Sequence, residues 1–178
     1  MTGGRRDDNT RLSSLEVFDD SSKEWKSLAP MSTIRLYHRS EVIDGKLYVF
    51  GGGDEFGNTL KCGECYDPQT DRWHSIRSMT YQRGCFRSVV FKNQIYVFGG
   101  SDAEQDFYTT VERYNPVTNK WATLKSMIHK RAHPFADVSC GKIFVFGGVN
   151  CWKPLNRINT VEMYDPETDT WEERHPMT

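Results

Sequence analysis

The sequence has no excess of charge of either sign and no long hydrophobic run. It holds 23 Lys and Arg against 24 Asp and Glu, for a formal net charge of −1. Interspersed charges of this kind offer no basic stripe to a phosphate backbone, so nucleic acid is not expected as a partner. The longest apolar runs reach about five residues, whereas a membrane-spanning helix needs roughly 20. A membrane partner is therefore not expected either.

The N-terminus also lacks an apolar segment of the kind found in secretory signals. A cytoplasmic location is expected, with the nucleus or the cytoskeleton as alternatives. The five cysteines form an odd set without regular spacing, which indicates free thiols in a reducing compartment. Cys62 and Cys65 do not predict a zinc site, because residues i and i+3 of a strand face opposite sides and no second pair matches them. No metal or cofactor is expected.

What the sequence does contain is a repeat. The triplet Phe-Gly-Gly begins at Phe50, Phe98 and Phe146, at intervals of 48 residues. Three other residue types follow the same spacing closely, namely Trp25, Trp73, Trp121 and Trp171; Glu16, Glu64, Glu112 and Glu162; and Met31, Met79, Met127 and Met177. A period near 50 residues is typical of a stacked or radial array of small units. Most recurring residues therefore need a structural explanation first.

Each unit reads as four short strands. In the unit at residues 83–127, β-rich segments at 83–91, 95–98, 110–114 and 121–124 are separated by polar or glycine-containing turns. The turn at 115–120 carries Pro116 at its second position, where a fixed φ is favoured. No segment keeps a helical apolar period. The sequence therefore predicts an all-β fold, with four-stranded antiparallel blades of a β-propeller.

These marks resemble the kelch repeat. The Gly-Gly doublet after a Tyr/Phe-Val strand, the Glu-x-Tyr/Phe-Asp/Asn motif and the Trp at a fixed offset cover nearly the whole chain. The Met-x-x-x-Arg order at Met31, Met79 and Met127 resembles the Kelch-like subgroup in particular. Members of that subgroup typically join a BTB domain and a BACK linker to a six-bladed kelch propeller.

The chain departs from that pattern in its length. Gly3 and Gly4 stand 48 residues before Gly51 and Gly52, so they look like the doublet of an earlier blade. We expect a partial blade at residues 1–31, holding the end of its second strand and its third and fourth strands. Three kelch repeats follow at 32–79, 80–127 and 128–178. The chain is thus expected to form about three and a half blades of a propeller, as a fragment or truncated form.

The repeated residues are first given structural roles. The glycine doublets are interpreted as points of close backbone approach, because no Lys-Ser/Thr or helix follows them as in a phosphate loop. The tryptophans are expected to fill the space between blades. The repeated glutamates are expected to bind a neighbouring strand, with a partner that the sequence does not identify.

Arg35, Arg83 and Arg131 are the candidate binding residues among the repeated positions. If each lies at the mouth of a central channel, their guanidinium groups could bind carboxylates of an acidic peptide. The alternative is a structural arginine paired with a carboxylate or carbonyl of its own blade. The family resemblance favours binding, since arginines at this position contact acidic peptides in some Kelch-like substrate adaptors.

The loops between second and third strands differ most from unit to unit, and such loops usually carry recognition. The interval from doublet to Glu is 12 residues in two units and 14 in the last, so the loop at 149–159 is enlarged. The first two loops are acidic and the third is basic. The predicted partner-binding residues in these loops are Asp54, Phe56, Asp102, Phe107, Asn150, Trp152 and Arg157.

The leading functional hypothesis is a non-catalytic module that binds a protein substrate or an acidic peptide. The resemblance implies the substrate receptor of a cullin-RING ubiquitin ligase, whose cullin contact belongs to a BTB–BACK segment absent from this sequence. An actin-binding or cytoskeletal kelch protein is the alternative. A propeller enzyme is a third possibility, but no galactose-oxidase-like or sialidase-like constellation is visible, so catalysis is not expected.

Overall fold

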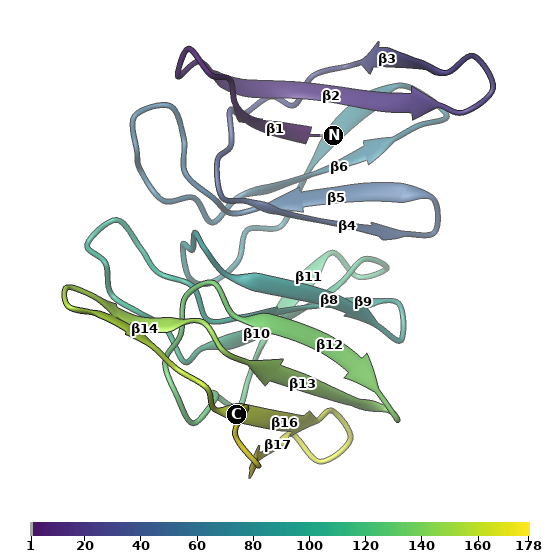
Figure 1. Cartoon of the computed structure of the whole chain (residues 1–178). Coiled ribbons are helices and arrows are strands. Elements are labelled where there is room, and N and C mark those ends of the chain that lie inside the picture. The colour runs from purple at the N-terminus through teal and green to yellow at the C-terminus, as the bar shows by residue number, and fades with distance from the viewer. Residues whose placement is uncertain (1) are drawn as a thin grey trace.

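The protein, seen in a computed structural model that describes residues 2–178, is built from antiparallel sheets. None of the described residues forms a helix, so none of them belongs to a helix that could cross a membrane. Figure 1 shows the sheets stacked one after another, from the N-terminal sheet at the top to the C-terminal sheet at the bottom. The predicted all-β fold of four-stranded blades is confirmed.

We number these sheets blades 1 to 4 in chain order. Blade 1 has three strands, β1 (Thr2–Arg5), β2 (Arg11–Asp19) and β3 (Glu24–Leu28). Blade 2 has four, β4 (Arg39–Ile43), β5 (Lys46–Phe50), β6 (Gly63–Asp67) and β7 (Arg72–Ile76). Blade 3 consists of β8 (Arg87–Phe91), β9 (Gln94–Phe98), β10 (Val111–Asn115) and β11 (Lys120–Leu124). Blade 4 consists of β12 (Phe135–Ser139), β13 (Lys142–Phe146), β16 (Val161–Asp165) and β17 (Thr170–Arg174).

A small separate hairpin is inserted into blade 4. Its strands are β14 (Val149–Trp152) and β15 (Leu155–Arg157), which pair with each other and with no strand of the blade. The hairpin occupies the loop that the sequence shows to be enlarged. The extra residues therefore form an ordered element of their own.

The middle strands are apolar on both faces because each blade is covered by its neighbours. Ile95, Tyr96, Val97 and Phe98 of β9 are all buried, whereas β11 at the outer edge of the same blade is mostly exposed. Such continuous apolar runs are expected of strands covered on both sides. The burial pattern follows directly from the stacking.

Two hydrophobic clusters fill the interfaces between consecutive blades. The first joins blades 2 and 3 and includes Tyr48 and Phe50 on one side and Ile95 and Tyr114 on the other. The second joins blades 3 and 4 through an equivalent set of side chains. Trp121 and Trp171 pack against these clusters, as the sequence predicts for the repeated tryptophans.

Three of the repeated tryptophans also make a hydrogen bond to the preceding blade. The indole Nε1–H donates to a backbone carbonyl, from Trp73 to Ala29 at 2.7 Å, from Trp121 to Arg77 at 2.7 Å and from Trp171 to Lys125 at 2.8 Å. The backbone N–H of the same three acceptor residues is bound by a turn residue of the following blade, namely Asp71, Asn119 and Asp169. Outer turns thus fasten each blade to the one before it.

The glycine doublets make the corresponding contact toward the following blade. Gly51 and Gly52 have φ values of +64° and +87°, and a Cβ on Gly51 would lie 2.7 Å from the carbonyl oxygen of Arg83. The N–H of Gly52 donates to that same oxygen at 2.9 Å. The predicted close approach of backbone to backbone is confirmed, because a side chain here would separate the two blades.

Candidate partner-binding surface

The loops that join second and third strands lie on one side of the molecule. In Figure 1 they project to the left, together with the hairpin β14–β15, while the tight turns between other strands lie to the right. We call this side the loop face. Because it carries the segments that differ most between blades, it is the candidate partner-binding surface.

The three arginines predicted to line this surface are instead buried inside the blades. Arg35, Arg83 and Arg131 are each 0% exposed. Charged groups as large as guanidinium are buried only when they are paired, and all three are. The expectation of an exposed arginine rim is corrected here, because these side chains present no surface to a partner.

Each guanidinium is held by the same set of acceptors in its own blade. Arg83 donates to the carbonyl oxygens of Gly99 at 2.7 Å and Thr110 at 3.2 Å, and to a carboxylate oxygen of Glu112 at 2.9 Å. Arg35 and Arg131 bind the equivalent carbonyls and Glu64 or Glu162. These arginines are therefore structural residues, each paired with a carboxylate and with carbonyl groups of its own blade.

The same contacts identify the partner of the repeated glutamates. Glu64, Glu112 and Glu162 each accept hydrogen bonds from the arginine and from backbone N–H groups of the segment that enters the blade. Each glutamate thus joins the third strand to the linker that precedes the first strand. Burial lowers the pKa of Arg83 and Arg131 from the ordinary arginine value, which the paired glutamates partly oppose.

An aromatic cluster stands on the loop face where blades 3 and 4 meet. The ring of Trp152, in β14, lies 5.3 Å from the ring of Phe107 and 5.7 Å from that of His133. Trp152 and Phe107 are half-buried and His133 is exposed. The enlarged loop therefore places its tryptophan against a residue of the neighbouring blade, so the two predicted residues Phe107 and Trp152 form one site.

Three positions around this surface have left-handed backbone. Tyr37, Cys85 and His133 have φ values of 55°, 55° and 49° and follow their buried arginines by two residues. Non-glycine residues in this region are uncommon and concentrate at functional sites. Tyr37 is 63% exposed, and His133 stands in the aromatic cluster. Because the left-handed residue recurs two positions after each arginine, it belongs to the entry turn that blades 2, 3 and 4 share.

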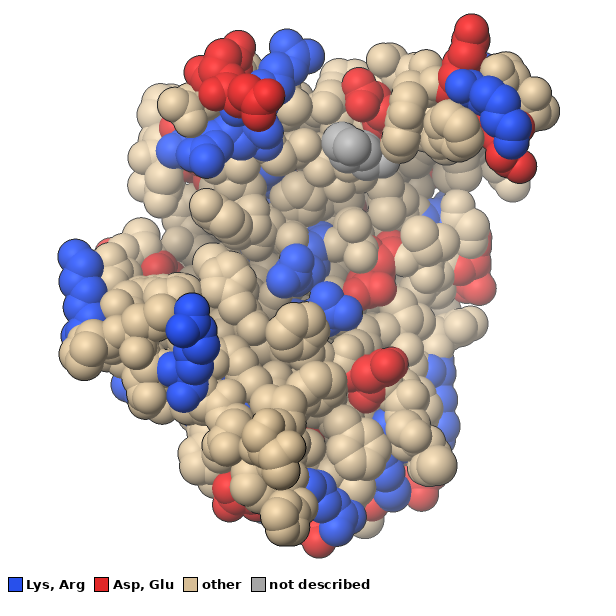
Figure 2. Space-filling model, viewed as in Figure 1, with Lys and Arg blue, Asp and Glu red and all other residues tan. Residues whose placement is uncertain are grey.

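Basic side chains lie close to the aromatic cluster. Arg39 and Arg87, the first residues of β4 and β8, are half-buried, and the charge of Arg87 helps to lower the pKa of Arg39, after burial. Burial, and then the charge of Arg39, lowers the pKa of His133 from its usual value. His133 is therefore neutral near pH 7. Figure 2 shows further basic side chains over the hairpin β14–β15, which contains Lys153 and Arg157.

Asp54 and Asp102 use their carboxylates to shape their own loops. Asp54 accepts hydrogen bonds from the backbone N–H groups of Phe56 and Asn58 and from the Asn58 amide, and these bonds, led by the amide, lower the pKa of its carboxyl. Asp102 accepts from the Tyr108 hydroxyl at 2.8 Å and from the N–H of Asp106. Both residues also line a cavity of about 200 Å³ between the two loops.

The remaining predicted residues are spread over the loop face. Phe56 is 81% exposed at the tip of the blade 2 loop, apart from the aromatic cluster. Asn150 accepts a hydrogen bond from Asn156 across the hairpin and so supports its shape. Arg157 is exposed at the end of β15. The structure thus joins Phe107 with Trp152, and Asp54 with Asp102, but it does not unite all of them.

The described residues contain no group of three or more His, Cys, Asp or Glu side chains placed to hold a metal ion. Cys62 and Cys65 contact different groups. The sulfur of Cys62 accepts a hydrogen bond from Arg35, while Cys65 is buried in the cluster between blades 2 and 3.

Two family models match this chain end to end. Residues 1–127 match the KLHDC2/KLHL20/DRC7 Kelch-repeats domain, and residues 130–178 match the Kelch motif. Among solved structures, the "Structure of YjhT" superimposes with a TM-score of 0.80 at 20% identity, covering 99% of this chain and 65% of the other. At that identity the likeness shows the fold alone.

Curated relatives align over shorter segments. Kelch-like protein 41b of Danio rerio is 42% identical over 32% of this chain, and Kelch-like protein 40 of Mus musculus is 37% identical over 33%. The Influenza virus NS1A-binding protein homolog of Mus musculus is 38% identical over 29%. The matched segments span only 9%, 10% and 8% of those three proteins, respectively.

Proposed function

This chain belongs to the kelch-repeat family, and from its loop face we propose that it is a non-catalytic module that binds a protein partner. The observation that carries the proposal is the cluster of Phe107, His133 and Trp152. The ring contact of 5.3 Å between Phe107 and Trp152 joins blades 3 and 4, the contact of 5.7 Å adds His133, and all three residues are partly open to solvent.

An aromatic cluster on an ordered support is a favourable anchor for a protein. Tryptophan and arginine are enriched among the residues that dominate binding energy, and anchors held in place lose little conformational entropy on binding. Trp152 pairs with Leu155 across the hairpin, the charge of Arg39 acts on His133, and Lys153 and Arg157 are exposed on the same hairpin. A partner segment with apolar residues flanked by carboxylates fits this surface best.

The finer proposal concerns the assembly in which the module acts. Kelch-like proteins are among its relatives, so we place it as the substrate-recognition part of a cullin-RING ubiquitin ligase adaptor acting in the cytoplasm. In such an adaptor the kelch part recognises the substrate and other domains bind the cullin. A relative named for binding the influenza NS1A protein also supports protein recognition as the shared role.

The loop-face proposal is tested by capture of partners from cell extract with the 178-residue chain and two variants. The double variant Phe107→Ala/Trp152→Ala should lose capture at least tenfold while keeping its melting temperature within a few degrees. Val117→Ala is the matched control, because Val117 is 93% exposed but lies in the β10–β11 turn, away from the loop face. Capture that is unchanged in the double variant contradicts the proposal.

The adaptor proposal is tested separately with the full-length protein. It should co-purify with a cullin, and its captured partner should gain ubiquitin when the two are expressed together. Co-sedimentation with actin in the absence of cullin would assign the module to the cytoskeletal class instead.

A further inference from the structure

A groove of about 940 Å³ runs along the outer rim between blades 2 and 3. Its walls come from the end of β7 and the segment after it, from Lys61, and from the β10–β11 turn with the start of β11. It shares no lining residue with the aromatic cluster or with the cavity between the two loops. The groove is therefore distinct from the aromatic cluster and from that cavity, and only Lys61, at the end of the β5–β6 loop, belongs to a loop of the loop face.

Three cations line this groove, and no carboxylate lines it. Lys61, Arg77 and Lys120 are all exposed, and within residues 2–178 none of their side chains makes an ion pair. The nearest carboxylate in contact with a lining residue is that of Glu112, which accepts the N–H of Thr80 but is fully buried and paired with Arg83. The local positive charge stands out in a chain whose net charge is −1.

The equivalent positions at the other interfaces do not carry this charge. Between blades 1 and 2 they are Ser13, Ala29 and Arg72, and between blades 3 and 4 they are Thr109, Lys125 and Thr170. Each of those interfaces also has an aspartate, Asp71 or Asp169, at the turn position that accepts a backbone N–H of the preceding blade, where the groove has the neutral Asn119. We call this bond, together with the tryptophan hydrogen bond to the same backbone residue, the latch. The repeat scaffold therefore does not require three cations, and each of the other sets is balanced by its own carboxylate.

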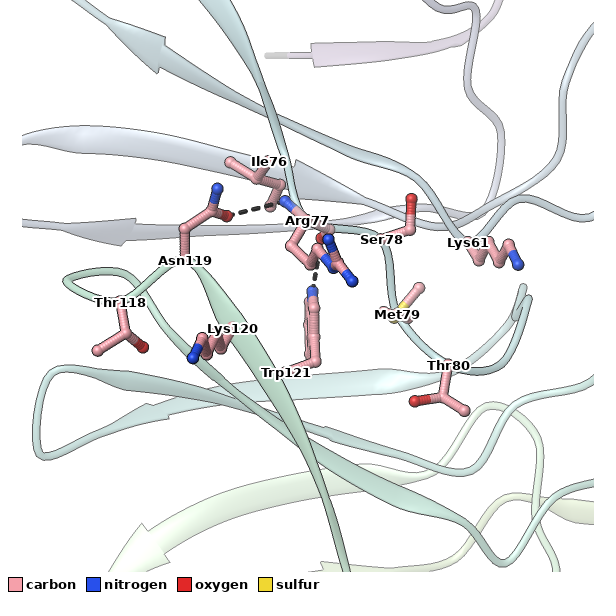
Figure 3. A pocket seen from close by; sticks show the side chains of 10 residues that line it. All are labelled: Lys61, Ile76, Arg77, Ser78, Met79, Thr80, Thr118, Asn119, Lys120 and Trp121. Atoms are coloured by element: carbon pink, nitrogen blue, oxygen red, sulfur yellow. Dashed lines mark hydrogen bonds between the residues drawn. The ribbon is translucent and has the colours of Figure 1, made fainter.

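The cations are spread along the groove and do not converge on one point. Figure 3 shows Lys61 and Lys120 on opposite sides of Arg77 and Trp121. Single phosphate sites gather their donors around one anion, whereas a line of separated cations suits an extended chain with several carboxylates. The hydroxyls of Ser78, Thr80 and Thr118 add polar groups along the walls.

From this juxtaposition we propose that the groove between blades 2 and 3 binds an extended acidic segment of a protein partner. The latch beneath the groove uses only the backbone N–H and C=O of Arg77. The Arg77 side chain is therefore left to face the ligand, and its removal leaves the latch intact. Lys61 likewise contributes only its backbone carbonyl to the fold, as the acceptor for Met79.

The test measures fluorescence polarisation of a labelled peptide of about eight residues rich in Glu and Asp. The wild-type chain should bind it, and added salt should weaken binding because exposed charges are screened. The variant Lys61→Glu/Arg77→Glu/Lys120→Glu should bind at least tenfold more weakly. The matched control Lys23→Glu/Lys92→Glu/Lys130→Glu changes net charge equally at exposed sites outside the groove and should stay within twofold of wild type.

Three further measurements keep the result unambiguous. Melting temperatures establish that each variant is folded, and the milder Lys61→Gln/Arg77→Gln/Lys120→Gln variant should show a smaller loss in the same direction. The loop-face variant Phe107→Ala/Trp152→Ala should bind the peptide normally, which separates this site from the proposed function. A peptide with Gln in place of Glu and Asn in place of Asp should not bind.

Several outcomes overturn the proposal. One is absence of peptide binding to the wild-type chain at low salt. Another is an equal loss in the groove variant and in the control variant, which would show only non-specific attraction. A single-stranded oligonucleotide of equal charge that binds the groove more tightly than the peptide would exclude an acidic protein segment as the preferred ligand.

Discussion

Arg83 and Glu112 form a hydrogen-bonded ion pair in which neither side chain is exposed to solvent, with 2.9 Å between Nη2 and Oε2. The carboxylate also accepts hydrogen bonds from the backbone N–H groups of Thr80 and Tyr81. Equivalent pairs join Arg35 to Glu64 and Arg131 to Glu162. The pair holds the linker between blades against the third strand.

Removing one member of the buried pair should destabilise the protein severely. Glu112→Gln or Arg83→Met leaves an uncompensated or half-satisfied buried group, for which a loss of about 3–5 kcal/mol is typical. Urea unfolding would measure it, with Lys92→Met as the control, because the Lys92–Glu167 pair is 64% and 71% exposed and should contribute less than about 1 kcal/mol. Similar losses in the two variants would contradict this account.

Cys62 occupies a position where blades 3 and 4 have threonine. Arg83 and Arg131 donate to the hydroxyls of Thr110 and Thr160 at 3.0 and 2.9 Å, while Arg35 donates to the sulfur of Cys62 at 3.2 Å. Because a hydroxyl is the better acceptor, Cys62→Thr should stabilise the protein by up to about 1 kcal/mol. Cys62→Ala removes the acceptor and should destabilise it. Denaturant midpoints in reducing buffer would check both, and a Thr variant less stable than Ala would refute the equivalence.

The indole hydrogen bond between blades should be measurable by itself. Trp121→Phe retains most of the ring but loses the donor to the Arg77 carbonyl, which should cost about 0.5–1.5 kcal/mol. Trp25→Phe is the matched control, because Trp25 is 57% exposed and its Nε1 has no hydrogen-bond partner within residues 2–178. Comparable unfolding free energies for the two variants would show that the latch contributes little.

Acidification should weaken the fold through His38. Burial, and then the charge of Arg35, lowers the pKa of this imidazole to about 4, from 6.5 in the unfolded chain. The unfolded state therefore binds the proton first as the pH falls, so stability is lost between about pH 6.5 and 4. One pKa unit corresponds to about 1.4 kcal/mol, so the loss is at most about 3.5 kcal/mol.

The contribution of His38 is isolated by comparing wild type with His38→Gln between pH 7 and 5. The variant should show a flatter dependence of unfolding free energy on pH. His133→Gln serves as the control, since the pKa of that more exposed ring is lowered by less burial. Parallel pH profiles for wild type and His38→Gln would disprove the assignment.

Repetition made the blades predictable, because a doublet, a Trp and a Glu in constant phase leave few alternatives to stacked four-stranded sheets. The same repetition misled the interpretation of the arginines. A position that recurs in every unit answers a need that every blade shares, and Arg83 with Glu112 meets the need to join linker to strand. The glutamate recurring in phase with the arginine was the available sign of that pairing.

The loop contacts could not be predicted from the sequence. Phe107 and Trp152 lie 45 residues apart in different blades, and only the folded hairpin β14–β15 brings their rings together. The cations of the groove come from three separate segments and share no phase. Their proximity depends on how blades 2 and 3 are stacked, which short-range patterns do not encode.

The glycine doublets and the latches bear on which parts of this sequence can vary during evolution. Gly52 contacts the blade ahead, and Trp121 contacts the blade behind, both through backbone atoms of the neighbour. Neither contact uses the tips of the loops, so the cohesion of the blades and recognition by the aromatic cluster on the loop face are encoded at separate positions. The loops can therefore change in length, charge or sequence without altering the backbone contacts between neighbouring blades. New binding specificities can then arise with little loss of folding stability.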